Sequence, residues 1–225
     1  MDDQRFEADT VLRDDPDCPS YGLNLTCAWP LPNEVRDSYE DLAAQLSALD
    51  GGLYVYPHRQ THITLVTLVS FMNCLRPDEN TLGQLVALGQ RINGRLTSAL
   101  LDWCPRGSFQ LIPDRLRLSP RAATLECSNP GGEVRELRQG VLTNLRADPE
   151  LYAWLLSLGF RIPDIIHTTV LRFVRPPRFP DIFADGFDAV GRRIRIPPFE
   201  VRQVLFSAET LPYMRRGEVL AQFSL

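Results

Sequence analysis

Two short stretches of the chain carry the same pattern, a histidine followed two residues later by a threonine within a run of branched apolar residues. The stretches are Gln60-Thr61-His62-Ile63-Thr64-Leu65-Val66 and Ile165-Ile166-His167-Thr168-Thr169-Val170-Leu171. Such runs predict β-strands, in which alternate side chains share a face. His62 and Thr64 should therefore lie on one face, as should His167 and Thr169. Two such strands facing each other can hold one anion between two imidazoles and two hydroxyls.

The repeated pattern is unusual for a chain that contains only three histidines. Serine and threonine together supply 23 of the 225 residues. At that frequency, two of three histidines would share a hydroxyl residue at this offset roughly a few per cent of the time. The matching strand context makes coincidence rarer still.

Apolar periodicity predicts interspersed strands and helices along the rest of the chain. The predicted strands cover residues 21–29 (half-buried), 53–56, 62–70, 108–112, 115–118, 122–127, 165–174, 199–207 and 218–225. The predicted helices run from Asn33 to Gly51, over residues 82–100 after Pro77, over 134–145, and from Pro149 to Gly159. Residues 175–191 are rich in proline and aspartate and are predicted to form a loop.

The order of these elements predicts a mixed α+β fold with antiparallel sheets, because short turns join several strands. The order is roughly duplicated, which indicates two similar lobes that face each other. Residues 1–19 carry seven acidic groups and few apolar ones, and we expect them to form a mobile arm or a surface wrap. Residues 20–225 should form one two-lobed domain, a length that supports a sizeable core.

All 24 cationic side chains are arginine, since the sequence contains no lysine. This excludes Schiff-base chemistry, a Walker lysine and a covalent nucleotidyl-lysine intermediate. Arginine binds phosphate through a planar fork of donors, although genomic composition bias is the better explanation for the missing lysine. The net charge of −4 argues against a large non-specific nucleic-acid surface, so DNA is not an expected partner.

Five widely spaced cysteines with no Cys-x-x-Cys pair argue against both a disulfide framework and a zinc knuckle. No apolar run is long enough to cross a membrane, and the acidic N-terminus lacks the apolar core of a secretory signal. We therefore expect reduced thiols and a cytoplasmic location, with the nucleus as the alternative. We expect a monomer with no metal, no cofactor and no membrane partner.

The paired motif resembles the two-histidine (2H) phosphoesterase superfamily. This group includes cyclic phosphodiesterases, bacterial 2′-5′ RNA ligase relatives, 2′-5′ oligoadenylate-cleaving enzymes and a nucleotide-binding domain of kinase-anchoring proteins. His62-Ile63-Thr64-Leu65 matches the first motif, and His167-Thr168-Thr169-Val170-Leu171-Arg172 matches the second and the arginine that often follows it. Ile166 stands where relatives often have proline. The resemblance covers residues 21–225 and implies two pseudo-symmetric lobes, each a small antiparallel sheet backed by helices, around a central cleft.

The resemblance implies a metal-independent phosphodiesterase that hydrolyses a cyclic phosphate, 2′,3′-cyclic or 1″,2″-cyclic, on a small nucleotide or an RNA end. One of His62 and His167 would act as general base and the other as general acid, in an order that the sequence leaves open. Thr64 and Thr169 would donate hydrogen bonds to the non-bridging oxygens. The alternatives are a 2′-5′ or 3′-5′ oligonucleotide phosphodiesterase and a non-catalytic nucleotide-binding module of the same fold.

Five further side chains are weaker candidates for contact with substrate. They are Tyr56, His58, Phe109, Arg172 and Tyr213. Phe109 and Tyr213 are candidates for stacking on a base, with core packing the better expectation for Phe109. His58 is expected to be a solvent-exposed turn residue. By strict strand alternation, Arg172 should point away from the face of His167. Contact with the edge of the cleft and a surface or core-edge ion pair are equally expected for its guanidinium.

Overall fold

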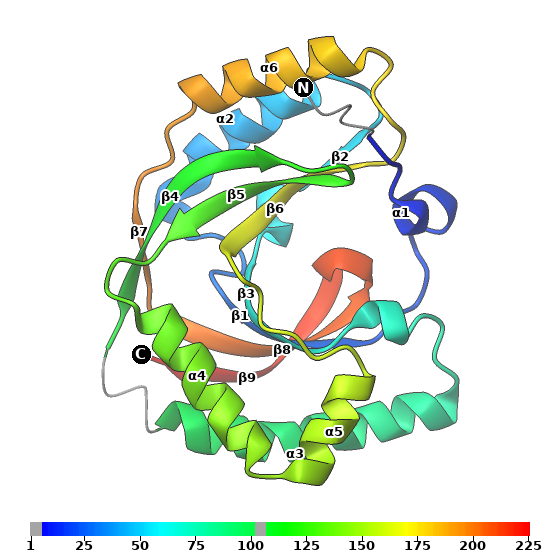
Figure 1. The fold of residues 1–225 in the computed structure, drawn as a ribbon, viewed down its shortest axis with the longest axis vertical. Helices are drawn as coiled ribbons and strands as arrows, with labels where there is room; N and C mark the ends of the chain where they lie inside the picture. Colours follow the sequence, from blue (N-terminus) through cyan, green and yellow to red (C-terminus); the bar gives the residue numbers. More distant parts are fainter. Residues whose placement is uncertain (1–5, 102–106) are drawn as a thin grey trace.

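The strands of the computed structural model, which describes residues 6–101 and 107–225, form two antiparallel sheets (Figure 1). The four-stranded sheet has the order β3-β1-β8-β9, and the five-stranded sheet has the order β2-β6-β5-β4-β7. The strands are β1 (Gly22–Cys27), β2 (Leu53–Val55), β3 (Ile63–Val69), β4 (Phe109–Leu118), β5 (Ala122–Ser128), β6 (Ile166–Phe173), β7 (Phe199–Val201), β8 (Gln203–Leu211) and β9 (Arg216–Ser224).

Helices cover the outer face of each sheet: α3, α4 and α5 lie over the four-stranded sheet, and α2 and α6 lie over the five-stranded sheet (Figure 1). The helices are α1 (Thr10–Asp14), α2 (Arg36–Ser47), α3 (Glu79–Leu101), α4 (Glu133–Arg146), α5 (Pro149–Ser157) and α6 (Pro180–Arg193), with 3₁₀ turns η1 (Asn33–Val35), η2 (His58–Gln60), η3 (Phe71–Asn73) and η5 (Pro212–Met214). The predicted fold of two helix-backed antiparallel lobes is therefore confirmed. In the described part of the chain, no helix has the length and apolar character needed to cross a membrane.

Each lobe contains segments from both ends of the chain. In the four-stranded sheet, the early strand β1 lies between β3 and the late strand β8. In the five-stranded sheet, the early strand β2 pairs with the late strand β6. The two lobes consequently do not correspond to the two halves of the sequence, and the chain crosses between them several times.

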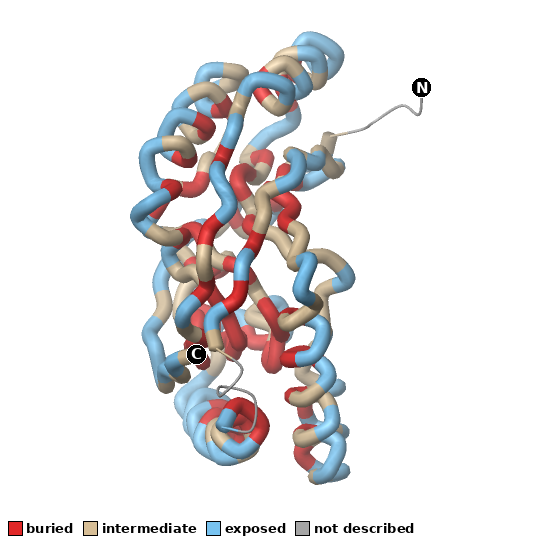
Figure 2. Tube along the Cα trace, turned by 90° about the vertical axis from the view of Figure 1, so that its left-hand side faces the viewer, coloured by how far each residue is buried: buried red, intermediate tan, exposed pale blue. Residues whose placement is uncertain are grey.

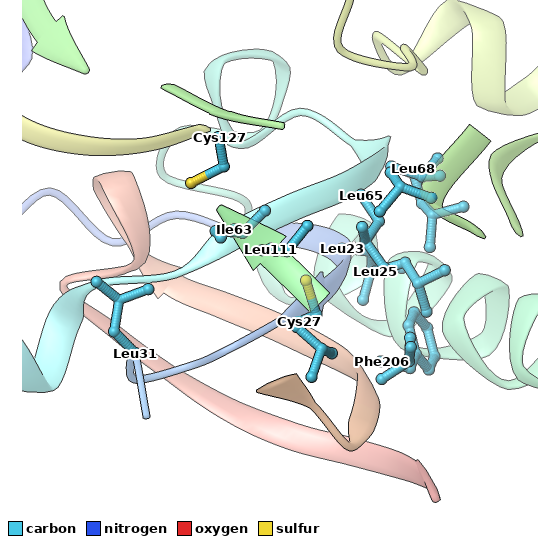
Figure 3. Packing of buried hydrophobic residues seen from close by; sticks show 14 of the residues in the cluster. Leu23, Leu25, Cys27, Leu31, Ile63, Leu65, Leu68, Leu111, Cys127 and Phe206 are labelled. Atoms are coloured by element: carbon cyan, nitrogen blue, oxygen red, sulfur yellow. The ribbon is translucent and has the colours of Figure 1, made fainter. Parts of the chain in front are cut away.

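One hydrophobic core runs through both lobes, and Figure 2 shows buried residues concentrated along the inner strands. Figure 3 shows Leu111 and Cys127 of the five-stranded sheet close to Ile63 and Cys27 of the four-stranded sheet. Every residue of β1 is buried, so the prediction of a half-buried strand is wrong. β1 is central in its sheet, and the second lobe covers the face that alternation assigned to solvent.

Two of the predicted strand assignments divide the chain differently from the structure. Residues 108–112 and 115–118, predicted as separate strands, belong to one strand, β4, in which a register shift accommodates Pro113. Residues 199–207, predicted as one strand, divide at Arg202 into β7 and β8, which belong to different sheets. Pro113 suggested a break between two strands, but a bulge accommodates it within β4. The continuous apolar pattern of residues 199–207 gave no sign of the change of sheet at Arg202.

The prediction of a loop over residues 175–191 is wrong, because most of these residues form helix α6. Pro180 occupies the first turn, where its missing N–H costs nothing. Phe183, Phe187 and Val190 are buried at helical spacing and form one apolar stripe. The content of proline and aspartate obscured this periodicity.

The N-terminal segment, residues 6–19, lies against the domain. The N–H of Asp9 donates to the carbonyl of Phe173 at 2.6 Å, and the rings of Phe6 and Phe173 are 4.9 Å apart. Farther along, the carbonyl of Pro19 accepts a hydrogen bond from the N–H of Arg76 at 2.7 Å. Residues 6–19 therefore lie along the surface of the domain, and residues 1–5 of the predicted arm lie outside the described residues.

Replacement of Phe187 tests the packing of α6. Phe187 is 2% exposed, so Phe187→Ala leaves a cavity and should lower the free energy of unfolding by about 3–5 kcal/mol. Ile182 lies on the same helix but is 69% exposed, so Ile182→Ala should change stability by about 0.5 kcal/mol or less. Urea denaturation of both variants gives the comparison, and equal effects would contradict the assigned face of the helix.

Candidate active site

Both motif pairs, His62 with Thr64 and His167 with Thr169, line one cavity between the two sheets. His62 directly precedes β3 and Thr64 lies within it, whereas His167 and Thr169 lie in β6. β3 and β6 contact each other although they belong to different lobes. The cavity has a volume of about 830 Å³, so both pairs reach a common space large enough for a nucleotide-sized ligand.

Each motif strand contains a β-bulge directly after its threonine. The register of β3 against β1 skips Leu65, and the register of β6 against β5 skips Val170. A bulge shifts the alternation of side chains by one residue, so the next cavity-lining positions are Thr67 and Arg172. The expectation that Arg172 points away from the face of His167 is wrong for this reason.

The imidazole of His62 is fixed by the backbone two residues earlier. Its Nδ1 lies 3.0 Å from the carbonyl oxygen of Gln60, so in the neutral ring Nδ1 carries the proton and donates. Burial lowers the pKa of His62 to about 4; the positive charges of His167 and Arg172 act in the same direction, and the Gln60 carbonyl opposes them. Neutral His62 therefore keeps the Nε2 lone pair free to accept a proton.

The imidazole of His167 also has a lowered pKa, and burial is again the main cause. The nearby cations Arg138 and Arg161 lower this pKa further, whereas the Ile165 carbonyl and Glu126 oppose the shift. The Nδ1 atom of His167 is buried and makes no hydrogen bond of normal geometry to any described residue. Nearby negative charge would favour its protonated form.

A buried arginine from α4 joins the two motif strands. The Nε of Arg138 donates to the carbonyl of Leu65 at 2.9 Å, and its Nη2 donates to that of Ile165 at 3.2 Å and, more weakly, to that of Thr64 at 3.5 Å. Burial lowers the pKa of this guanidinium. One side chain thus ties β3 to the residue that precedes β6, near His167.

Three groups hold the guanidinium of Arg172 at one end of the cavity. Its Nε donates to the hydroxyl of Tyr56 and its Nη1 to the carboxylate of Asp9, both at 3.1 Å. Its Cζ lies 3.7 Å from the ring centroid of Tyr213, and Phe71 contacts that ring edge-on. Because Arg172 covers one face of Tyr213, a base can stack on that face only if the guanidinium moves.

A buried carboxylate, Glu209 of β8, also faces the cavity. It accepts hydrogen bonds from the Nδ2 of Asn24 at 3.2 Å and from the backbone N–H of Met214 at 2.6 Å. Burial raises the pKa of Glu209 to about 7, while these donors and Arg172 act in the opposite direction. Tyr213 and Met214 adopt positive φ angles, a turn that brings the Met214 N–H to the carboxylate.

The remaining candidates from the sequence divide between the cavity and the core. Tyr56 and Tyr213 line the cavity, whereas Phe109 and His58 do not. Phe109 is buried in the hydrophobic core, so the expectation of core packing rather than base stacking is confirmed. His58 is 7% exposed, with its ring 6.0 Å from that of Tyr39. The prediction of a solvent-exposed turn histidine is wrong, because η2 folds inward against α2.

Sequence reasoning missed several residues of this region. They are Asp9, Asn24, Thr67, Arg117, Arg121, Arg138, Arg161 and Glu209. Two of them had a detectable signal: Glu209 interrupts an apolar strand, and Arg138 falls four residues after Val134 on an apolar helix stripe. The described residues contain no group of three or more His, Cys, Asp or Glu side chains placed to hold a metal ion. Cys18, Cys27, Cys74 and Cys127 are buried free thiols, and Cys104 lies outside the described residues.

Three solved structures resemble the chain over most of its length. TT0787 of Thermus thermophilus has a TM-score of 0.54 at 20% identity, covering 91% of this chain and 97% of that one. E. coli LigT complexed with ATP has a TM-score of 0.50 at 16% identity, covering 92% and 98%. A conserved protein of unknown function from Agrobacterium tumefaciens has a TM-score of 0.54 at 16% identity, covering 92% and 87%. No protein-family model and no curated protein matches the sequence. At these identities the likeness establishes the fold.

Replacement of Arg138 tests its role in joining the motif strands. Arg138→Met keeps the apolar stem but leaves the carbonyls of Leu65 and Ile165 without their donor, and should lower the free energy of unfolding by about 2–3 kcal/mol. Arg135→Met removes an exposed arginine from the same helix and should change it by about 0.5 kcal/mol or less. Denaturant titration measures both, and an Arg138 variant as stable as the control would refute the role.

Proposed function

We propose that this chain, which has the fold of the 2H phosphoesterase superfamily, is a phosphodiesterase that hydrolyses a nucleotide or RNA-end cyclic phosphate. The observation that carries the proposal is the convergence of two imidazoles and two threonines on one cavity. Further support comes from the LigT structure, in which a protein of the same fold is complexed with ATP. A 2′,3′-cyclic or 1″,2″-cyclic phosphate is the leading substrate.

The proposed reaction is an in-line displacement at phosphorus. A water molecule attacks the phosphorus and gives a proton to one imidazole, while the bond to the departing ribose oxygen breaks and the other imidazole protonates that oxygen. The product is a phosphomonoester beside a free hydroxyl. Hydroxyl groups of Thr64 and Thr169 donate to the non-bridging oxygens, where negative charge grows in the transition state.

We assign the general base to His62 and the general acid to His167. His62 is held neutral by its low pKa, and its Nδ1 is engaged by the Gln60 carbonyl, which leaves Nε2 as the proton acceptor. His167 must carry a proton when substrate is bound. The charge of a bound phosphate, together with Glu126, favours that form against the effect of burial.

Two alternatives use the same cavity. A 2′-5′ or 3′-5′ oligonucleotide phosphodiesterase would apply the same acid and base to an acyclic linkage, and the arginines that line the cavity could bind the additional phosphates of such a substrate. A non-catalytic nucleotide-binding module would hold the ligand without water in position for attack. Incubation with 2′,3′-cyclic nucleotides in the presence of EDTA separates an enzyme from the module, because the module binds the ligand without forming a phosphomonoester. A parallel incubation with 2′-5′ and 3′-5′ dinucleotides shows which linkage the enzyme hydrolyses faster.

Replacement of either motif histidine should abolish most of the activity. His62→Ala and His167→Ala should each lower kcat on 2′,3′-cyclic AMP by about a hundredfold or more, because each removes one proton transfer. The assay is product formation by chromatography, with thermal unfolding to show that each variant is folded. His62→Gln and His167→Gln, which keep the side-chain volume, serve as second variants. Near-normal rates in both pairs would refute the mechanism.

The adjacent threonines of the second motif provide a matched pair. Thr169 lines the cavity, whereas Thr168 is 1% exposed on the other face, with a buried hydroxyl that has no hydrogen-bond partner among the described residues. Thr169→Val should lower kcat by about tenfold to a hundredfold through loss of one donor to the transition state. Thr168→Val should leave kcat within about twofold and stability unchanged or higher. Equal effects would contradict the assigned faces of β6.

A further inference from the structure

Three arginines surround the cavity in addition to Arg172. They are Arg117, Arg121 and Arg161, in a protein whose net charge is −4. Two of them are paired on the surface, Arg117 with Glu126 at 3.2 Å and Arg121 with Glu7 at 2.7 Å. Arg161 is exposed, and its guanidinium makes no ion pair or hydrogen bond with any described residue.

The backbone of Arg161 is nevertheless fixed beside the first motif strand. Its N–H donates to the carbonyl of Thr67, and its carbonyl accepts from the N–H of Thr67, both at 2.9 Å. Thr67 itself lines the cavity. The positive charge of Arg161 also lowers the pKa of His167, so the guanidinium lies within electrostatic range of that histidine. This cation is anchored at the site, and no described carboxylate pairs with it.

Two of the three carboxylates that line the cavity are engaged elsewhere. Asp9 pairs with Arg172, and Glu209 accepts hydrogen bonds from Asn24 and Met214. Asp164 is exposed and makes no ion pair within the described residues, although its charge acts on the buried Arg138. A ligand anion is therefore the natural partner for Arg161, and arginine matches the geometry of phosphate oxygens.

We propose that Arg161 binds a second phosphoryl group of the substrate, outside the phosphate held between His62 and His167. The position of the first phosphate rests on the proposed function. The substrate would then be a 5′-phosphorylated nucleotide end or a short oligonucleotide, since a bare nucleoside cyclic phosphate has no second phosphoryl group to occupy this subsite.

Binding of product-like ligands tests the subsite without requiring turnover. Calorimetry at fixed ionic strength compares adenosine 3′-monophosphate with adenosine 3′,5′-bisphosphate, and with a 3′-phosphorylated dinucleotide that lacks a 5′-phosphate. The wild-type protein should bind at least one of the two-phosphate ligands about tenfold more tightly than the monophosphate. The ligand that gains affinity identifies the second phosphate as the 5′ group or the neighbouring linkage.

Removal of the guanidinium should abolish this preference selectively. Arg161→Ala and Arg161→Gln should reduce the affinity ratio to about one, while the monophosphate binds within about threefold of wild type. Arg193→Ala, which removes the same charge from the exposed last turn of α6, should retain the ratio. An NMR titration should show a higher pKa for His167 in the Arg161 variants, since a nearby positive charge is gone.

Three results would refute the proposed subsite. They are no preference of the wild-type protein for a two-phosphate ligand, an unchanged preference in both Arg161 variants, or an equal loss of the preference in Arg193→Ala. Failure of the proposed function gives a different pattern. In that case 2′,3′-cyclic nucleotides are not hydrolysed, yet the preference for two phosphates among the product-like ligands and its dependence on Arg161 remain measurable.

Discussion

The buried guanidinium of Arg138 is the interaction on which the geometry of the site depends. The sheets belong to different lobes, and strand hydrogen bonds alone do not set the distance between β3 and β6. Arg138 holds them together directly, because one planar group donates to a carbonyl of β3 and to the carbonyl of the residue that precedes β6. Its charge also lowers the pKa of His167. The guanidinium of Arg138 thus both supports the second motif and lowers the pKa of its histidine. Replacement of Arg138 by a neutral residue would alter both.

The paired bulges extend the internal symmetry beyond what the repeated motif displays. Each motif strand presents a histidine, a threonine two residues later, and a third side chain five residues after the histidine. The third position is Thr67 in one lobe and Arg172 in the other. The two motif strands are thus alike at the histidine and threonine positions, which would hold the scissile phosphate. They differ at the third position, where contacts with the rest of the substrate would be made.

Local pattern predicted most elements of the fold and the central residues of the cavity. Alternation and helical spacing identified β3, β6, α3 and α4, because each buries one face along a continuous stretch. The same reasoning failed for α6, where composition masked the spacing of Phe183 and Phe187. It failed for Arg172 because a bulge cannot be read from side-chain alternation. Asp9 reaches the cavity only through its contact with Arg172 in a distant segment, which no local pattern encodes.

The central place of β1 in the four-stranded sheet has a consequence for how the molecule assembles. One neighbour, β3, begins at Ile63, but the other, β8, begins only at Gln203. Pairings of such high contact order form slowly and tend to come last. Glu209 lies in β8 and Tyr213 directly follows it, so the cavity is complete only when this late part of the chain has paired with β1. Truncation near the C-terminus should therefore abolish the cavity even where every motif residue is retained.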